Sequence, residues 1–130
     1  MTPTAVPRPT DAELAILRVI WKFGRATVRE IHEEVLHEQP RTGYTTVLKL
    51  LQIMTDKGLV VRDESQRAHV YAPKESEQST QGRLVCHLVD RAFDGSATAL
   101  VMQALSTKKA SPEELATIRE LLEKIEGERR

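Results

Sequence analysis

The fold is decided by the stretch TGYTTVLKLLQIMTDKG, which covers residues 42–58. Its apolar side chains recur every three or four residues, a spacing that predicts a helix from about Thr42 to Lys57. Gly58 follows directly and can adopt the left-handed conformation that ends many helices. A rotation of about 100° per residue gathers the apolar side chains on one face. This face comprises Val47, Leu50, Leu51 and Met54, with Tyr44 at its edge.

The opposite face of this helix is polar. It carries Thr45, Lys49, Gln52 and Asp56, flanked by Thr46 and Ile53. From Gln39 to Thr55 there are two basic residues, Arg41 and Lys49, and no acidic one. Such a face suits a helix that reads DNA, because short side chains reach base edges while hydroxyls and lysine bind phosphates. An ordinary solvated surface has the same composition, so the neighbouring elements must decide between the two interpretations.

Two short helices are predicted before this stretch. A hydroxyl followed three residues later by Glu, the spacing of a capping box, occurs at Thr10 and again at Thr27. The two boxes predict helices over residues 11–23 and from Val28 to a stop at Pro40.

A β-hairpin is predicted after it. Residues 59–62 and 68–72 are rich in β-forming side chains and flank the polar turn 63–67. Three helices followed by a hairpin are the order of a winged helix-turn-helix. The sequence therefore predicts a mainly α chain with a small β-hairpin.

The predicted organisation has three parts. Residues 1–9, with three prolines, form a flexible N-terminal arm. Residues 10–74 form the winged-helix DNA-binding domain, and residues 75–130 form a helical dimerisation domain. Three helices over so short a segment make a marginal core, so their apolar stripes need a partner. A second copy of the chain is one partner, and folding back onto the first domain is the alternative. The predicted dimer contacts are Leu84, Val85, Leu88, Val89, Leu100, Val101, Leu121, Leu122 and Ile125.

Composition excludes several classes of protein. The 130 residues include 19 Lys and Arg and 19 Asp and Glu, a net charge of zero, which gives no support to a strongly basic nucleic-acid coat or a polybasic membrane anchor. No apolar run is long enough to insert into a membrane, and no signal peptide is recognisable. A single Cys cannot form an internal disulfide, so a cytoplasmic location is expected.

The zero net charge conceals a small asymmetry. Residues 1–73 hold 10 basic and 9 acidic side chains, and residues 74–130 hold 9 and 10. The DNA-reading part is thus barely basic. The placement of a few cations on one face, doubled in a dimer, predicts a modest and salt-sensitive affinity for DNA.

No enzyme, metal site or cofactor is predicted. His32 and His37 are five residues apart, whereas a zinc-protease helix needs two His four apart on one face. His32 is more simply a partly buried residue of its helix. Cys86, His87 and Asp90 share one helical turn, but two or three ligands make a poor metal site without a partner chain. Cys86 is therefore predicted to be a small core residue.

The candidate DNA contacts come from the third helix, its start and the hairpin. They are Arg41, Thr42, Tyr44, Thr45, Thr46, Lys49, Gln52, Arg62 and Arg67. Asp63 and Glu64, in the turn of the hairpin, are negatively charged and count against strong binding of DNA by the hairpin. A winged helix that contacts proteins, without sequence-specific DNA binding, is the alternative. The salt dependence of binding to promoter DNA discriminates between the two.

Several of these stretches also match a known family. The most specific are residues 13–21 with Gly24, residues 27–31, residues 43–47 leading to 57–59, and residues 67–69 with Tyr71 and Pro73. Over roughly residues 8–125 the chain resembles the BlaI/MecI/CopY family of bacterial transcriptional repressors, also called the penicillinase-repressor family. The resemblance implies a homodimer whose third helix enters the major groove of a palindromic double-stranded operator. By position it implies DNA contacts by Thr45, Thr46 and Lys49, with Arg67 in the wing.

The departures from this family concern its signals. BlaI and MecI types are cleaved at an Asn–Phe bond after a membrane sensor protease is activated, and the matching positions in this chain are Gln103-Ala104. CopY types carry paired Cys-x-Cys motifs, which a chain with only Cys86 lacks. Ile53 and Asp56 stand where members often have basic residues. Sensor-triggered proteolysis, a small ligand, and a metal shared across a dimer all stay open as the signal.

Overall fold

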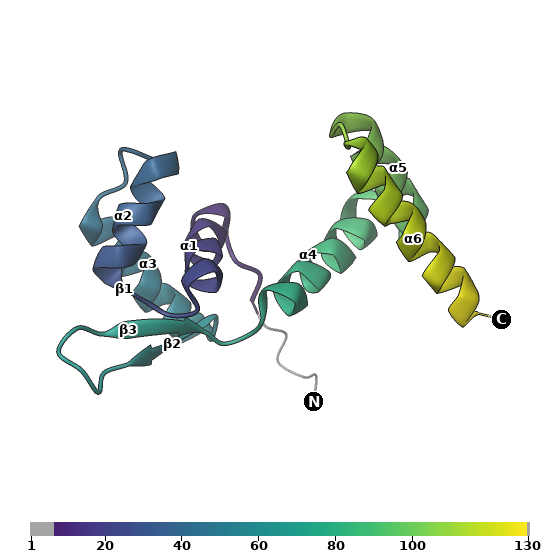
Figure 1. Cartoon of the computed structure of the whole chain (residues 1–130). Helices are drawn as coiled ribbons and strands as arrows, with labels where there is room; N and C mark the ends of the chain where they lie inside the picture. Colours follow the sequence, from purple (N-terminus) through teal and green to yellow (C-terminus); the bar gives the residue numbers. More distant parts are fainter. Residues whose placement is uncertain (1–6, 130) are drawn as a thin grey trace, which may run out of the picture. The chain divides into compact units, whose positions relative to one another are not determined.

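Six helices and three short strands form in residues 7–129, the part of the chain that the computed structural model describes. They are α1 (Asp11–Phe23), β1 (Ala26–Thr27), α2 (Val28–Glu38), α3 (Tyr44–Lys57), β2 (Val60–Asp63), β3 (Val70–Pro73), α4 (Glu77–Ala92), α5 (Ala97–Thr107) and α6 (Pro112–Glu128). The contacts between residues divide the chain into two units, residues 1–84 and 85–130. Figure 1 labels these elements and colours them in the order of the sequence.

The helix starts follow the predicted capping boxes. At Thr10 and Thr27 the hydroxyl accepts from the backbone N–H of the Glu three residues later, and that Glu accepts from the cap's own N–H. Ser111 begins α6 in the same way, with Pro112 at the first helical position. The predicted helix 11–23 is confirmed in full, and Gly24 ends it at a φ of 83°.

The third helix begins two residues later than predicted. The Thr42 N–H donates to the carbonyl of Gln39, so Thr42 belongs to the preceding turn. Gly43 is then the N-cap, with extended backbone at φ −82° and ψ 158°. At the other end Gly58 has the predicted left-handed conformation, at φ 81° and ψ 22°.

The predicted hairpin is present, and a third strand joins it. The sheet is antiparallel with the order β1-β3-β2, so β3 lies in the centre. Tyr71 of β3 pairs with Ala26 on one side and Arg62 on the other, and its side chain is 1% exposed. Strand β1 was not predicted, because two residues carry no periodic signal and Thr27 also caps α2.

One core holds the three helices against the sheet. Each of α1, α2 and α3 contacts the other two, α1 also contacts β3, and α3 also contacts β2. The Trp21 indole N–H donates to the carbonyl of Glu75 over 3.2 Å, which ties α1 to the segment before α4. The buried side chains are Ile16, Leu17, Val19, Ile20, Ala26, Val28, Ile31, Val35, Val47, Leu51, Met54, Leu59, Val60 and Tyr71. Three helices and a hairpin packed in this way form a winged helix-turn-helix.

Two predictions about single side chains are resolved by this packing. His32 is half-buried on α2, as predicted. Cys86 is exposed, so its prediction as a core residue was wrong. On the second half of α4, to which Cys86 belongs, the buried side chain is that of Val89. The predicted N-terminal arm falls mostly on residues 1–6, which lie outside the described residues, and residues 7–9 form no helix or strand.

The second unit buries little of its apolar surface. Among its described residues, Val89 is the one buried hydrophobic side chain, at 9% exposure. Its exposed large hydrophobic side chains are Val85, Leu88, Val101, Met102, Leu105, Leu121, Leu122 and Ile125. Leu84, at the end of the first unit, and Leu100 are half-buried.

Candidate nucleic-acid interface

The surface of α3 is divided as its sequence predicts. Val47, Leu51 and Met54 are 0% exposed and fix the apolar side of the helix against the core. The polar side, which we call the α3 face, consists of exposed side chains: Thr45, Thr46, Lys49, Gln52, Ile53 and Asp56. Because one side of α3 is rigidly packed, the α3 face is a firm surface that can be presented to a ligand.

The start of α3 is held by a neighbouring helix. Gly43 offers no side chain to the first turn, and α3 has no side-chain cap. A ring nitrogen of His32 on α2 lies 2.9 Å from the carbonyl of Thr42. The same imidazole meets the ring of Tyr44 edge to face, with centroids 5.8 Å apart. His32 therefore positions the turn that leads into the α3 face, a role the sequence did not reveal.

A buried ion pair holds the other end of α3. Lys57 Nζ lies 2.8 Å and 3.0 Å from the two carboxylate oxygens of Glu13, whose side chain is 2% exposed. Burial raises the pKa of Glu13, but the hydrogen bond from Lys57, the N–H of Thr10 and the charge of Lys57 together hold it below its ordinary value. The pair joins α1 to α3 across 44 residues of sequence, so the Glu of the predicted capping box has a second partner.

The wing consists of β2, β3 and the loop between them, residues 60–73, and it carries two arginines. Arg62 pairs with Glu64 at 2.7 Å, so its charge is partly satisfied within the hairpin. Arg67 is exposed and takes part in none of the ion pairs found in residues 7–129.

Asp63, one of the two acidic residues of the wing, stabilises the turn. Asp63 accepts from the N–H of Ser65 at 2.9 Å and from Arg25 at 2.9 Å. The hydrogen bonds from Ser65, followed by the one from Arg25, lower the pKa of Asp63. Asp63 was predicted to weaken a grip on DNA, but its charge is engaged by the turn and by Arg25.

The remaining candidate residues lie close to the α3 face. Arg41 is exposed and Thr42 is half-buried in the turn before α3, and Tyr44 is 48% exposed at the first position of the helix. These three residues thus lie at the N-terminal end of α3. Arg67 of the wing lies near the same end, because it lines one hollow together with Tyr44. Among the described residues there is no group of three or more His, Cys, Asp and Glu side chains able to hold a metal ion.

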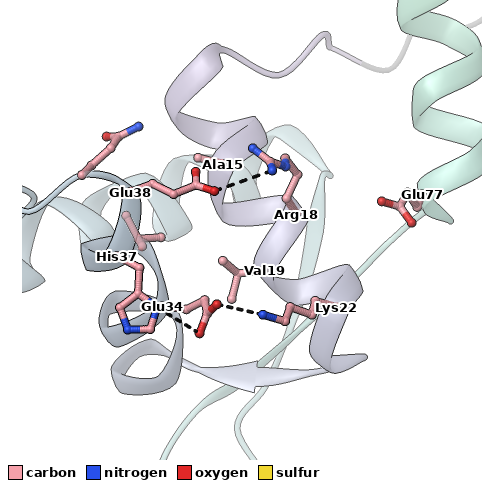
Figure 2. A pocket seen from close by; sticks show the side chains of 10 residues that line it. Ala15, Arg18, Val19, Lys22, Glu34, His37, Glu38 and Glu77 are labelled. Atoms are coloured by element: carbon pink, nitrogen blue, oxygen red, sulfur yellow. Dashed lines mark hydrogen bonds and ion pairs between the residues drawn. The ribbon is translucent and has the colours of Figure 1, made fainter. Parts of the chain in front are cut away.

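A separate hollow of about 220 Å³ lies between α1 and α2. Figure 2 shows that ion pairs span it: Lys22 faces Glu34 at 2.9 Å, and Arg18 faces Glu38 at 3.7 Å. The hydrogen bond from Lys22 lowers the pKa of Glu34. Both cations of this hollow are therefore paired with acidic side chains, and none of the candidate DNA contacts lines it.

No helix among the described residues has the length and apolar content that crossing a membrane requires.

Known proteins are similar to this chain over most of its length. The sequence model of the penicillinase repressor family matches residues 9–124. The penicillinase repressor of Bacillus licheniformis is 26% identical over 121 residues, which cover 91% of each chain. The transcriptional regulator BlaI of Mycobacterium tuberculosis is 30% identical over 119 residues, covering 90% of this chain and 84% of the relative.

A solved structure supports the fold of the first unit. The solution structure of the DNA-binding domain of the repressor BlaI superposes with a TM-score of 0.51 at 27% identity. The match covers 58% of this chain and 90% of that domain. Together with the match to residues 9–124, this likeness shows that the chain belongs to the penicillinase repressor family.

Proposed function

We propose that this chain is a DNA-binding transcriptional repressor that reads its operator with α3 and the wing. The observation that carries the proposal is the α3 face. Its polar side chains are all exposed, while the opposite side of the helix is packed to 0% exposure at Val47, Leu51 and Met54. The likeness to the DNA-binding domain of the repressor BlaI and membership of a repressor family support it.

The α3 face supplies the contacts that specify sequence. Thr45, Thr46 and Gln52 have the short or amide side chains that suit base edges in the major groove. Lys49, in the middle of the face, is suited to a phosphate. No residue from Gln39 to Thr55 is acidic, so no carboxylate repels the DNA along most of this face.

The start of α3 and the wing supply contacts to the DNA backbone. Arg41 and Thr42 lie where helix N–H groups attract phosphate, and Tyr44 adds a hydroxyl. Arg62 and Arg67 extend the contacts into the wing. With its α3 in the major groove and its wing on the adjacent backbone, each DNA-binding domain would contact one half of the operator.

We propose further that two copies form the repressor, with residues 10–74 as the DNA-binding domain and residues 75–130 as the dimerisation domain. The support is the apolar surface of the second unit, where, in the part that the structure describes, one hydrophobic side chain is buried and eight large ones are exposed. A self-complementary contact between two such surfaces brings two α3 faces to one palindromic site. Among the residues predicted for this contact, Val89 is 9% exposed in the single chain, so it offers little surface to a partner.

Derepression would act through the second unit. Sensor-triggered proteolysis is one of the open signals: the BlaI and MecI types are cleaved at an Asn–Phe bond, and this chain has Gln103–Ala104 in its place, within α5 and with both residues exposed. Cleavage there would separate the two halves of α5 and weaken the dimer on which operator affinity depends. Immunoblotting of the chain in cells before and after induction tests this step, and an intact chain in induced cells would exclude it.

The proposal is tested by titrating a duplex from the DNA directly upstream of the protein's own gene. Fluorescence anisotropy at several salt concentrations should give an affinity that falls steeply with salt, because each phosphate contact contributes about −0.9 to the slope of log affinity against log salt. An unlabelled duplex of random sequence is the control for specificity. A flat salt response, or no preference over the random duplex, would favour a protein-interaction module.

A further inference from the structure

A second hollow of the first unit lies between α2, α3 and the loop that leads into β3. It has a volume of about 330 Å³ and is open on one side. Arg29 lines it from the start of α2, Tyr44 from the start of α3, and Arg67 and His69 from the loop. We call it the α2–wing groove. Three segments far apart in the sequence therefore meet at one place.

The α2–wing groove is electropositive. No acidic side chain is among its lining residues. Arg29 uses its Nε to reach Glu33 at 3.3 Å, and its side chain is 84% exposed. Neither Arg67 nor His69 takes part in an ion pair within residues 7–129. In the hollow between α1 and α2 both Lys22 and Arg18 are paired, whereas in the α2–wing groove Arg29 alone has an acidic partner.

The groove also lies where a DNA strand would pass. Tyr44, which begins α3, and Arg67 of the wing both line it. A strand that runs from the helix in the major groove to the wing must cross the space between these two elements. Two guanidinium groups, an imidazole and a phenol hydroxyl provide several hydrogen-bond donors to an oxyanion there.

We propose that the α2–wing groove binds a phosphate of the DNA backbone, and that Arg29 and His69 contact this phosphate together with Arg67. This inference rests on the proposed function and adds two residues to it, one from α2 and one from the loop before β3. The imidazole of His69 can donate a ring N–H to an oxygen of this phosphate.

The test uses the full chain with the upstream duplex and with a random duplex. Arg29→Ala and Arg29→Lys probe the guanidinium, and His69→Gln probes the imidazole. Arg18→Ala is the matched control for Arg29, because Arg18 is also exposed, has one acidic partner and lines the other hollow. His37→Gln is the control for His69, since His37 is exposed at the far end of α2. Thermal unfolding confirms that each variant is folded.

Loss of one phosphate contact should reduce the salt slope by about 0.9 per bound chain, so the affinity lost by Arg29→Ala should be smaller at 200 mM than at 50 mM salt, by about 3.5-fold for one bound chain and about 12-fold for a bound dimer. The loss should be equal on both duplexes, because a phosphate contact carries no sequence information. Arg29→Lys should restore much of the slope. His69→Gln should weaken binding to both duplexes alike, while His37→Gln should keep the wild-type affinity.

The outcomes distinguish a failure of the groove inference from a failure of the repressor proposal. If the wild type binds with a steep salt slope while Arg29→Ala and His69→Gln match it in slope and affinity, the groove inference is wrong and the repressor proposal stands. If the wild type shows no salt-dependent binding, both are wrong. Inorganic phosphate titrated into the DNA-free protein, with the imidazole of His69 followed by NMR, tests for a free anion as the occupant. Tight saturation in that titration would overturn the assignment to DNA.

Discussion

Replacing Lys57 with Met removes the partner of a carboxylate that is almost wholly buried. Glu13 is 2% exposed and Lys57 is 30% exposed, with 2.8 Å between Nζ and the nearer carboxylate oxygen. Removing one partner of a fully buried pair costs about 3–5 kcal/mol, because the other charge is left uncompensated. Water reaches Lys57 and reduces this penalty, so we expect Lys57→Met to lower the free energy of unfolding by about 2–3 kcal/mol at neutral pH.

The loss should depend on pH in a defined direction. The pKa of Glu13 lies below its ordinary value of 4.5, so the pair stabilises the protein fully above that value and loses its effect as the pH falls through the lowered one. The difference between wild type and Lys57→Met should therefore shrink as the pH is lowered from 7 to about 3. Urea denaturation followed by circular dichroism at several pH values measures it.

Two variants give this prediction its controls. Lys22→Met removes the partner of Glu34 in an exposed pair, whose contribution to stability is small. Glu13→Gln combined with Lys57→Met removes the stranded charge, and a Gln can still accept from the N–H of Thr10 in the capping box. The double variant should recover most of the lost stability. If Lys57→Met costs no more than Lys22→Met, or if its cost is the same at acid and neutral pH, the buried pair does not anchor α3 as argued.

Three further predictions concern single side chains. Lys49→Ala should weaken binding to upstream DNA and leave the unfolding midpoint unchanged, because Lys49 is exposed; unchanged affinity would show that another face touches DNA. Leu88→Asp should convert the proposed dimer to monomer in sedimentation experiments, because Leu88 is 45% exposed in the single chain and the dimer would bury the new charge; a persistent dimer would remove this part of α4 from the interface. Leu51→Ala, at a position that is 0% exposed, should lower the free energy of unfolding by about 2–5 kcal/mol in urea titrations, and a loss below that range would mean that the core collapses around the cavity.

The sequence predicted the parts of the fold that depend on short spacings. The capping boxes at Thr10 and Thr27 and the stop at Gly58 were all readable, because each signal lies within a few residues. Strand β1 was missed, since Ala26 and Thr27 become a strand only by pairing with Tyr71 and Val70 more than forty residues away. The same limit applies to the start of α3, which depends on the turn between Gln39 and Thr42.

The candidate site shows the same difference between local signals, which the sequence reveals, and long-range contacts, which it does not. The α3 face follows from helical periodicity, so its exposed and buried sides were predicted together. The contact between Lys57 and Glu13 spans 44 residues, and the α2–wing groove joins Arg29 to His69. Nothing in the spacing of these residues reports that they meet. Cys86 was misjudged for a related reason: burial depends on what covers a helix, and the residue type alone does not tell that.

The absence of a side chain at Gly43 has a thermodynamic consequence. The N–H groups that begin α1, α2 and α6 are satisfied by the chain's own Ser, Thr and Glu side chains, whereas α3 begins without such a cap. A side chain would fit at Gly43, since nothing lies within 4 Å of the position of its missing Cβ and its φ of −82° suits any residue. Gly43→Ser would stabilise the free protein by a few tenths of a kcal/mol and occupy donors that a phosphate can use. On the proposed function, α3 is less stable in the free protein than a capped helix, and a bound phosphate would supply the missing acceptor, so the operator would act as a stabilising ligand of the fold.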